Sequence, residues 1–121
     1  MDGIREKLAT YIRRQADWRE SRAVGHPDDA RNRRCAVRLR ELAEHIEGLS
    51  DDDPNLLALD SVQAPYGLDH FAPGEEAQRM IFRFGFFPGP GEEDFDAFVT
   101  ELVSAEVNWS QELDESGQGG G

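Results

Sequence analysis

The spacing of the apolar residues most strongly constrains how this 121-residue chain can fold. In the segment 28–48 they recur at intervals of four and three, the spacing of one face of an α-helix. The segments 3–23, 54–62, 73–84 and 92–112 show related patterns, so we predict five helices. The clearest repeat consists of Cys35, Leu39, Leu42, Ile46 and Leu49.

Residues that begin and end helices separate these segments. Gly25-His26-Pro27 ends the first helix, and Asp28-Asp29 places negative charge where the second begins. Gly48 is a stop for the second helix, and Asp53-Pro54 is a start for the third. Two long amphipathic helices joined by a short turn form an antiparallel hairpin.

The segment 73–84 fits two structures. Alternating apolar residues at 80–86 are typical of a strand, but Pro73 followed by two glutamates indicates a helix start. No other segment offers a partner strand, so we predict a helix. Gly85 would then be the left-handed residue after it, and Phe86 would cover its last turn.

These elements predict an all-α fold, in which the N-terminal antiparallel helical hairpin packs with three further helices in a small bundle. We expect one domain over residues 1–113 and a disordered acidic, glycine-rich tail over 114–121. Trp18 and Trp109 each lie on an apolar stripe, so both are predicted to be buried.

The composition of the chain indicates the cellular compartment in which we expect the protein. The only cysteine, Cys35, excludes an internal disulfide and lies on the apolar stripe, so we expect a core residue and a reducing compartment. No apolar run approaches the roughly 18 residues of a membrane span, and the first residues do not resemble a signal peptide. We therefore expect a cytoplasmic protein without membrane contact.

Charge is distributed unevenly along the chain. Eleven of the 13 basic residues and nine of the 25 acids precede residue 49, so the first part carries +2 and the remainder −14. Such asymmetry indicates a partner surface or internal pairing. A net charge of −12 disfavours binding to a phosphate backbone.

The arginines at the hairpin tip are the candidate partner-binding residues. Antiparallel packing places the end of the first helix beside the start of the second, where cations oppose the helix dipole. The tip could bind an acidic protein or, less consistently with the net charge, nucleic acid. Alternatively, its arginines pair with Asp17, Glu20 and the acidic C-terminal part. The five candidates are Arg19, Arg22, Arg31, Arg33 and Arg34.

Motifs for phosphate, dinucleotide or zinc chemistry are absent from the sequence. His26 with Asp28 and Asp29, or the run Asp51-Asp52-Asp53, could hold a metal, although turns and helix caps explain the same residues. Asp69-His70 could act as an acid–base pair, but no nucleophile lies nearby in sequence. We therefore assign no catalytic residue, no metal ligand and no cofactor.

Four segments carry a resemblance to a type of small helical protein of actinobacteria for which no activity is known. The resemblance covers residues 9 to about 105. It implies a single all-α domain, and it supplies no catalytic residues that could be carried over to this chain. The segments are Ala16-Asp17-Trp18-Arg19, Pro27-Asp28-Asp29-Ala30-Arg31-Asn32, Asp51-Asp52-Asp53-Pro54 and Pro73-Gly74-Glu75-Glu76-Ala77.

The sequence thus predicts a non-enzymatic protein that binds another macromolecule, in the first place a protein. One alternative is an acidic decoy that imitates nucleic acid and blocks a nucleic-acid-binding protein, because the residues after position 48 carry 16 acids. A small metal-dependent enzyme is the third possibility. The oligomeric state and the process do not follow from the sequence.

Overall fold

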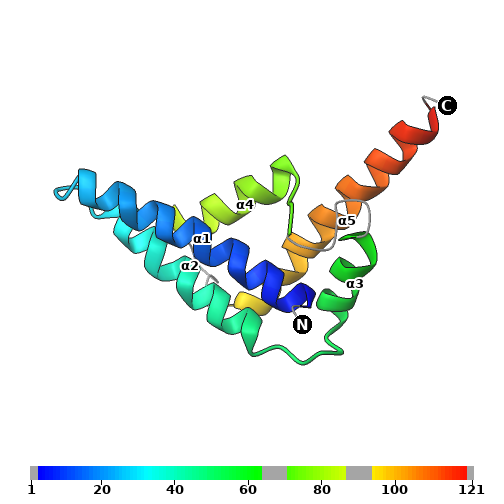
Figure 1. Ribbon diagram of the computed structural model, residues 1–121, viewed down its shortest axis with the longest axis horizontal. Coiled ribbons are helices and arrows are strands. Elements are labelled where there is room, and N and C mark those ends of the chain that lie inside the picture. Colours follow the sequence, from blue (N-terminus) through cyan, green and yellow to red (C-terminus); the bar gives the residue numbers. More distant parts are fainter. Residues whose placement is uncertain (1–2, 64–70, 87–93, 120–121) are drawn as a thin grey trace.

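The computed structural model describes residues 3–63, 71–86 and 94–119. This part of the chain contains helices and no strand, which confirms the all-α prediction (Figure 1). The helices are α1 (Ile4–Gly25), α2 (Arg31–Glu47), α3 (Pro54–Gln63), α4 (Glu75–Phe86) and α5 (Phe95–Gly119). Asp69 and His70, the residues of the possible acid–base pair, lie outside the described ranges.

Helices α1 and α2 form the predicted hairpin and share the most extensive contact in the protein. Leu8 and Ile12 of α1, and Leu39 and Leu42 of α2, are completely buried. Burying such a side chain contributes about 1.5–3 kcal/mol. Ala16 of α1 is equally buried. The hairpin is therefore the base on which α4 and, to a lesser extent, α3 pack.

The observed helix ends follow from local hydrogen bonds. Helix α2 begins at Arg31, not at 28, because Asp29 accepts the backbone N–H of Arg31 at 3.0 Å and so stands outside the helix. Helix α3 begins at Pro54 as predicted, and Asp53 accepts the N–H of Asn55 at 2.9 Å. Gly48 ends α2, also as predicted.

Helix α4 packs on α2, and Gly85 lies against Cys35 and Leu39 of α2. A Cβ atom at Gly85 would lie 2.4 Å from Sγ of Cys35, so only glycine fits there. The prediction that this segment is a helix is confirmed, but the predicted helix end is wrong. Gly85 and Phe86 are helical residues rather than the left-handed residue and covering residue that the sequence suggested. The glycine is needed for packing, not for a turn.

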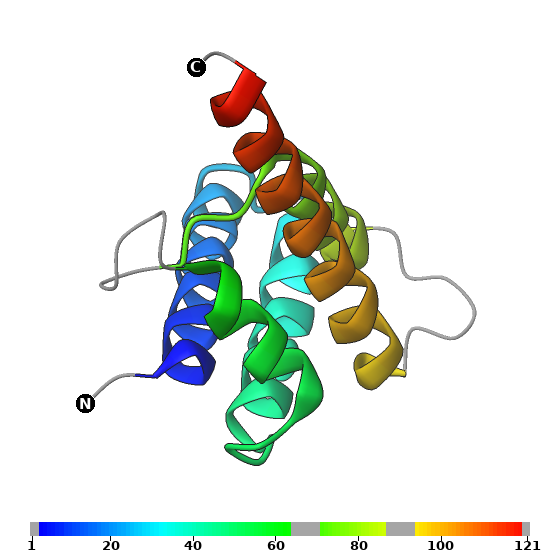
Figure 2. The same cartoon turned by 90° about the vertical axis from the view of Figure 1, so that its right-hand side faces the viewer.

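Helix α5 contacts both α3 and α4, and its C-terminal end projects beyond the other helices (Figures 1 and 2). It starts at Phe95 and continues through Gly119, so the predicted bounds 92–112 are wrong. Helical backbone therefore extends into the segment predicted as a tail. The extent of the domain and the disorder of 114–121 in solution stay predictions.

Candidate functional site

The candidate surface lies at the free end of the α1–α2 hairpin, where the last turns of α1 meet the first turn of α2 (Figure 1). It is built around Trp18, which is 48% exposed. The prediction that Trp18 is buried is wrong. The buried face of α1 runs through Ile12 and Ala16, and Trp18 projects beside it.

Arg19 lies at the centre of this surface and contacts three aromatic rings. Its guanidinium carbon lies 4.3 Å from the ring centroid of Trp18, 4.6 Å from that of Phe82 and 4.4 Å from that of Phe86. A cation over a ring face is stabilised by about 0.5–2 kcal/mol, depending on desolvation. Arg19 therefore links α1 to the C-terminal half of α4.

The hydrogen-bond capacity of Arg19 is mostly unused. One terminal nitrogen donates to Oδ1 of Asn32 at 3.4 Å, and the buried Nε has no acceptor among the described residues. Burial lowers the pKa of Arg19, the charge of Arg22 lowers it further, and the thiol of Cys35 opposes this. The guanidinium keeps its charge, because the ordinary pKa of arginine is so high.

Arg22 completes the cluster of cations around Trp18. Its guanidinium carbon lies 5.7 Å from the Trp18 ring centroid, and the side chain is exposed. No ion pair engages Arg22 within the ranges that the structure describes. We call Trp18, Arg19, Arg22, Phe82 and Phe86 the Trp18 surface.

The three candidate arginines of α2 behave differently from these. Arg31 forms a two-pronged ion pair with Asp29, at 2.8 Å between its terminal nitrogen and Oδ2. The hydrogen bonds from Arg31 lower the pKa of Asp29 to about 2. Arg33 and Arg34 are exposed. The structure thus brings Arg19 and Arg22 together, occupies Arg31 locally, and leaves Arg33 and Arg34 at the surface.

The alternative pairing of these arginines with Asp17, Glu20 and the acidic C-terminal part is not found among the described residues. Asp17 and Glu20 both pair with Arg40, which reaches across the hairpin. None of the five candidates forms an ion pair with an acid of the C-terminal part within residues 3–63, 71–86 and 94–119.

Sequence reasoning missed Phe82 and Phe86 as members of this surface. Their four-residue spacing places both on one side of α4, which was a usable signal. The helical spacing of α4 indicates a buried face made of other residues, however. Nothing in the sequence indicates that the side of α4 with Phe82 and Phe86 lies against Arg19.

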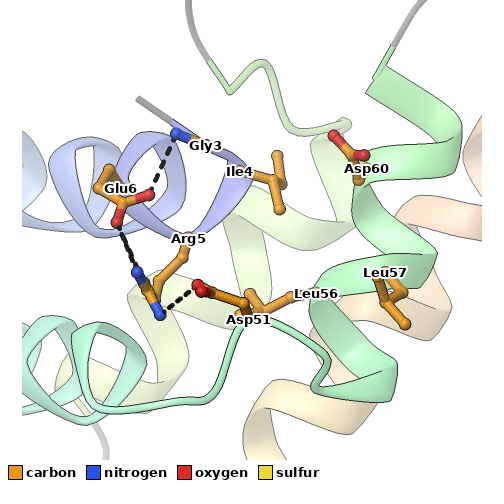
Figure 3. A pocket seen from close by; sticks show the side chains of 8 residues that line it. All are labelled: Gly3, Ile4, Arg5, Glu6, Asp51, Leu56, Leu57 and Asp60. Atoms are coloured by element: carbon orange, nitrogen blue, oxygen red, sulfur yellow. Dashed lines mark hydrogen bonds and ion pairs between the residues drawn. The ribbon is translucent and has the colours of Figure 1, made fainter. Parts of the chain in front are cut away.

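A second concave site, of about 200 Å³, lies between α3 and the start of α1 (Figure 3). Its only cation, Arg5, donates to Glu6 at 2.9 Å, to Asp51 at 2.8 Å and to the carbonyl oxygen of Leu49 at 2.8 Å. The hydrogen bond from Arg5 is the main reason that the pKa of Glu6 is lowered. These contacts join α1 to the segment before α3, and they occupy the guanidinium that an anionic ligand would need.

The other candidate constellations do not assemble into a metal site in the described part of the chain. No group of three or more His, Cys, Asp and Glu side chains is placed to hold a metal ion there. Asp29 is engaged by Arg31, and Asp51 by Arg5. Cys35 is fully buried, as predicted for a core residue, and burial raises the pKa of its thiol. Asp69 and His70 lie outside the described residues.

Comparison with protein families, with curated proteins and with solved structures finds no match to this chain. None of the helices, over the residues that the structure describes, is long and apolar enough to cross a membrane.

Proposed function

We propose that this protein has a non-enzymatic function and binds another protein through the Trp18 surface. The observation that carries the proposal is the exposure of Trp18, 48%, with two arginine side chains stacked against it. Tryptophan and arginine are the residues most enriched where interfaces concentrate their binding energy. A half-exposed tryptophan at the end of a hairpin is available for such contacts.

The chemistry of the surface favours a partner that presents carboxylates beside an apolar side chain. Arg22 forms no ion pair with any residue that the structure describes, and Arg33 and Arg34 are exposed in the first turns of α2. Arginine donates paired hydrogen bonds to carboxylates in a fixed planar geometry. A nucleic acid could use the same donors, but the chain's net charge of −12 opposes it.

The surface is also organised before binding. Phe82 and Phe86 restrain Arg19, and Arg19 in turn packs against Trp18. Because less side-chain freedom remains to be lost, the entropic cost of forming an interface is lower than on a surface of free side chains.

Site-specific photo-crosslinking in cells tests the proposal. A photoreactive phenylalanine analogue is placed at Trp18 or, as the matched control, at Leu57, which is 55% exposed on α3. We expect one protein to be crosslinked at position 18 and not at 57, and its affinity to fall at least tenfold with Arg22→Gln. Equal crosslinking at both positions, or an affinity unchanged by Arg22→Gln, would show that the Trp18 surface is not the binding site.

A second candidate function, the acidic decoy, is supported by the composition of α5. This helix contains several acids and no lysine or arginine from Phe95 to Gly119. A basic, nucleic-acid-binding partner would recognise such a helix by charge. Competition between this protein and DNA for that partner, lost when acids of α5 are converted to amides, would support the decoy over the Trp18 surface.

A further inference from the structure

Glu106 is a carboxyl group buried inside the bundle on α5, with only 1% of the residue exposed. Its Oε1 accepts the backbone N–H of Gly74 at 2.6 Å. Its Oε2 is buried and has no hydrogen-bond partner in the described part of the chain. Gly74 stands immediately before α4, so one carboxyl oxygen ties the beginning of α4 to the middle of α5.

Trp109 also lies against the backbone of Gly74. A Cβ atom at Gly74 would lie 2.6 Å from Cδ2 and 2.8 Å from Cγ of the Trp109 ring. Trp109 follows Glu106 by three residues, so both side chains lie on the same side of α5. The start of α4 is therefore bonded by one residue of α5 and covered by another.

Few other charges surround the carboxyl. From α1 it is faced by Tyr11, whose pKa is raised by burial and by the charge of Glu106, against a hydrogen bond with Gln78. From α4 and α5 the charged groups lie on the outer side, in a groove beside Trp109 lined by Glu75, Glu76, Arg79 and Glu112. From α3, Asp60 lines the separate pocket at Arg5. No cation neutralises Glu106 among these groups.

We propose that Glu106 is a pH-operated latch, which holds the start of α4 on α5 while it is protonated and loosens when it ionises. A neutral carboxyl needs only modest hydrogen bonding inside a protein. A carboxylate with one N–H donor and one unpartnered oxygen is strongly disfavoured there, and hydration offers it a better environment.

The direction with pH follows from the same physics. Burial raises the pKa of Glu106 from its ordinary 4.5 to about 7, and the hydrogen bond from Gly74 opposes the rise. The folded state keeps the proton that the unfolded chain loses, so the contribution to stability is complete below pH 4.5. It is lost as pH rises to about 7 and stays lost above that. The latch is closed in acid and loosens through neutral pH.

If the start of α4 loosens, the Trp18 surface changes too, because α4 also carries Phe82 and Phe86. This consequence for binding rests on the proposed function. The latch itself does not, because it can be observed in the protein without any partner.

Fluorine NMR of protein labelled with 5-fluorotryptophan observes both ends of α4 at once. We expect the Trp109 resonance to shift with a midpoint near pH 7 and the Trp18 resonance to follow it. In Glu106→Gln both should be independent of pH. His45→Gln is the matched control, because it removes a side chain that bonds Asp96 at 2.8 Å near the start of α5. It should leave the Trp109 transition in place.

Each outcome decides a part of the proposal. A Trp109 transition that persists in Glu106→Gln, or one that disappears in His45→Gln, would overturn the latch. A shift at Trp109 without one at Trp18 would keep the latch and remove its link to the binding surface. Should Glu106→Gln fail to fold, the ¹³C shift of the Glu106 carboxyl in the wild-type protein decides: a midpoint below pH 5.5 would overturn the proposal.

Discussion

The contact between Gly85 and Cys35 gives the sharpest prediction about the fold. The change Gly85→Ala adds one methyl group, whose carbon would lie 2.4 Å from Sγ of Cys35. The other nearest atoms, Cγ of Leu39 and Cβ of Cys35, lie at the ordinary contact distances of 3.5 and 3.6 Å. The clash is thus with one atom, and Cys35→Ala removes that atom.

The magnitude follows from two opposing effects. Adding a methylene to a packed core costs about 1–3 kcal/mol. Replacing glycine by alanine within a helix returns up to about 1 kcal/mol, less near a helix end such as this. Gly85→Ala alone should therefore lower the free energy of unfolding by about 1–2 kcal/mol. In the Cys35→Ala background the methyl enters the space left by sulfur, and we expect a coupling energy of at least about 1 kcal/mol.

Urea denaturation of the wild-type protein, both single variants and the double variant measures this cycle, with circular dichroism as the signal. If the free energy of unfolding falls equally steeply with urea concentration in all four proteins, their free energies of unfolding can be compared directly. The reasoning is refuted if Gly85→Ala costs the same in both backgrounds, or if it stabilises the wild-type protein. Either result would mean that α4 does not approach α2 as closely as the structure has it.

Two further changes test the Trp18 surface in the absence of a partner. Trp18→Ala should cost only about 1–2 kcal/mol rather than the roughly 3–5 kcal/mol of a fully buried aromatic residue, because about half of Trp18 is exposed; urea denaturation measures the cost, and a loss above 3 kcal/mol would contradict the exposure. Arg33→Gln with Arg34→Gln should change the stability by less than about 0.5 kcal/mol, because both are exposed and neither is ion-paired in the described structure. Thermal melting of that double variant shows this, and a clear drop would reveal an internal role for these arginines.

The helices could be predicted because their apolar spacing is a local property of the chain. On α2 the predicted stripe and the buried residues agree, including Cys35 and Ile46. On α1 the predicted apolar stripe includes Trp18, whereas the face that is buried lies beside Trp18. Trp18 is larger than Ala16, but Ala16 is completely buried and Trp18 is 48% exposed. Which of two adjacent stripes is buried depends on the neighbouring helix, and spacing alone does not contain that information.

The candidate site was only partly predictable for the same reason. Arg19 and Arg22 were identified from charge, but the rings around Arg19 come from α4, more than 60 positions along the chain. The position of Glu106 in the sequence does indicate burial, because Glu106 follows the buried Leu102 by four residues and so falls on the apolar face of α5. Its partner, the N–H of Gly74, follows only from how the helices pack.

The ion pairs of the hairpin also explain why the charge asymmetry of the sequence survives folding. Arg13 pairs with Glu47 and Arg31 with Asp29, so these arginines are neutralised by acids of the first part itself. The cations of the first part do little to offset the −14 carried by the remainder. A partner that presents carboxylates to the Trp18 surface therefore meets local attraction within an overall repulsive field.

This combination predicts an unusual dependence on salt, which separates the two proposed functions. Raising the ionic strength from about 0.02 to 0.2 M shortens the screening length from roughly 20 Å to below 10 Å. For an acidic partner at the Trp18 surface, the repulsion between the whole molecules is screened and association becomes faster. The arginine contacts are weakened at the same time, so dissociation becomes faster too. For a basic partner that recognises α5, association is steered by attraction and slows steeply with salt. Surface plasmon resonance of the crosslinked partner measures both rates. An association rate that falls as salt is added would exclude carboxylate recognition at Trp18 and favour the acidic decoy.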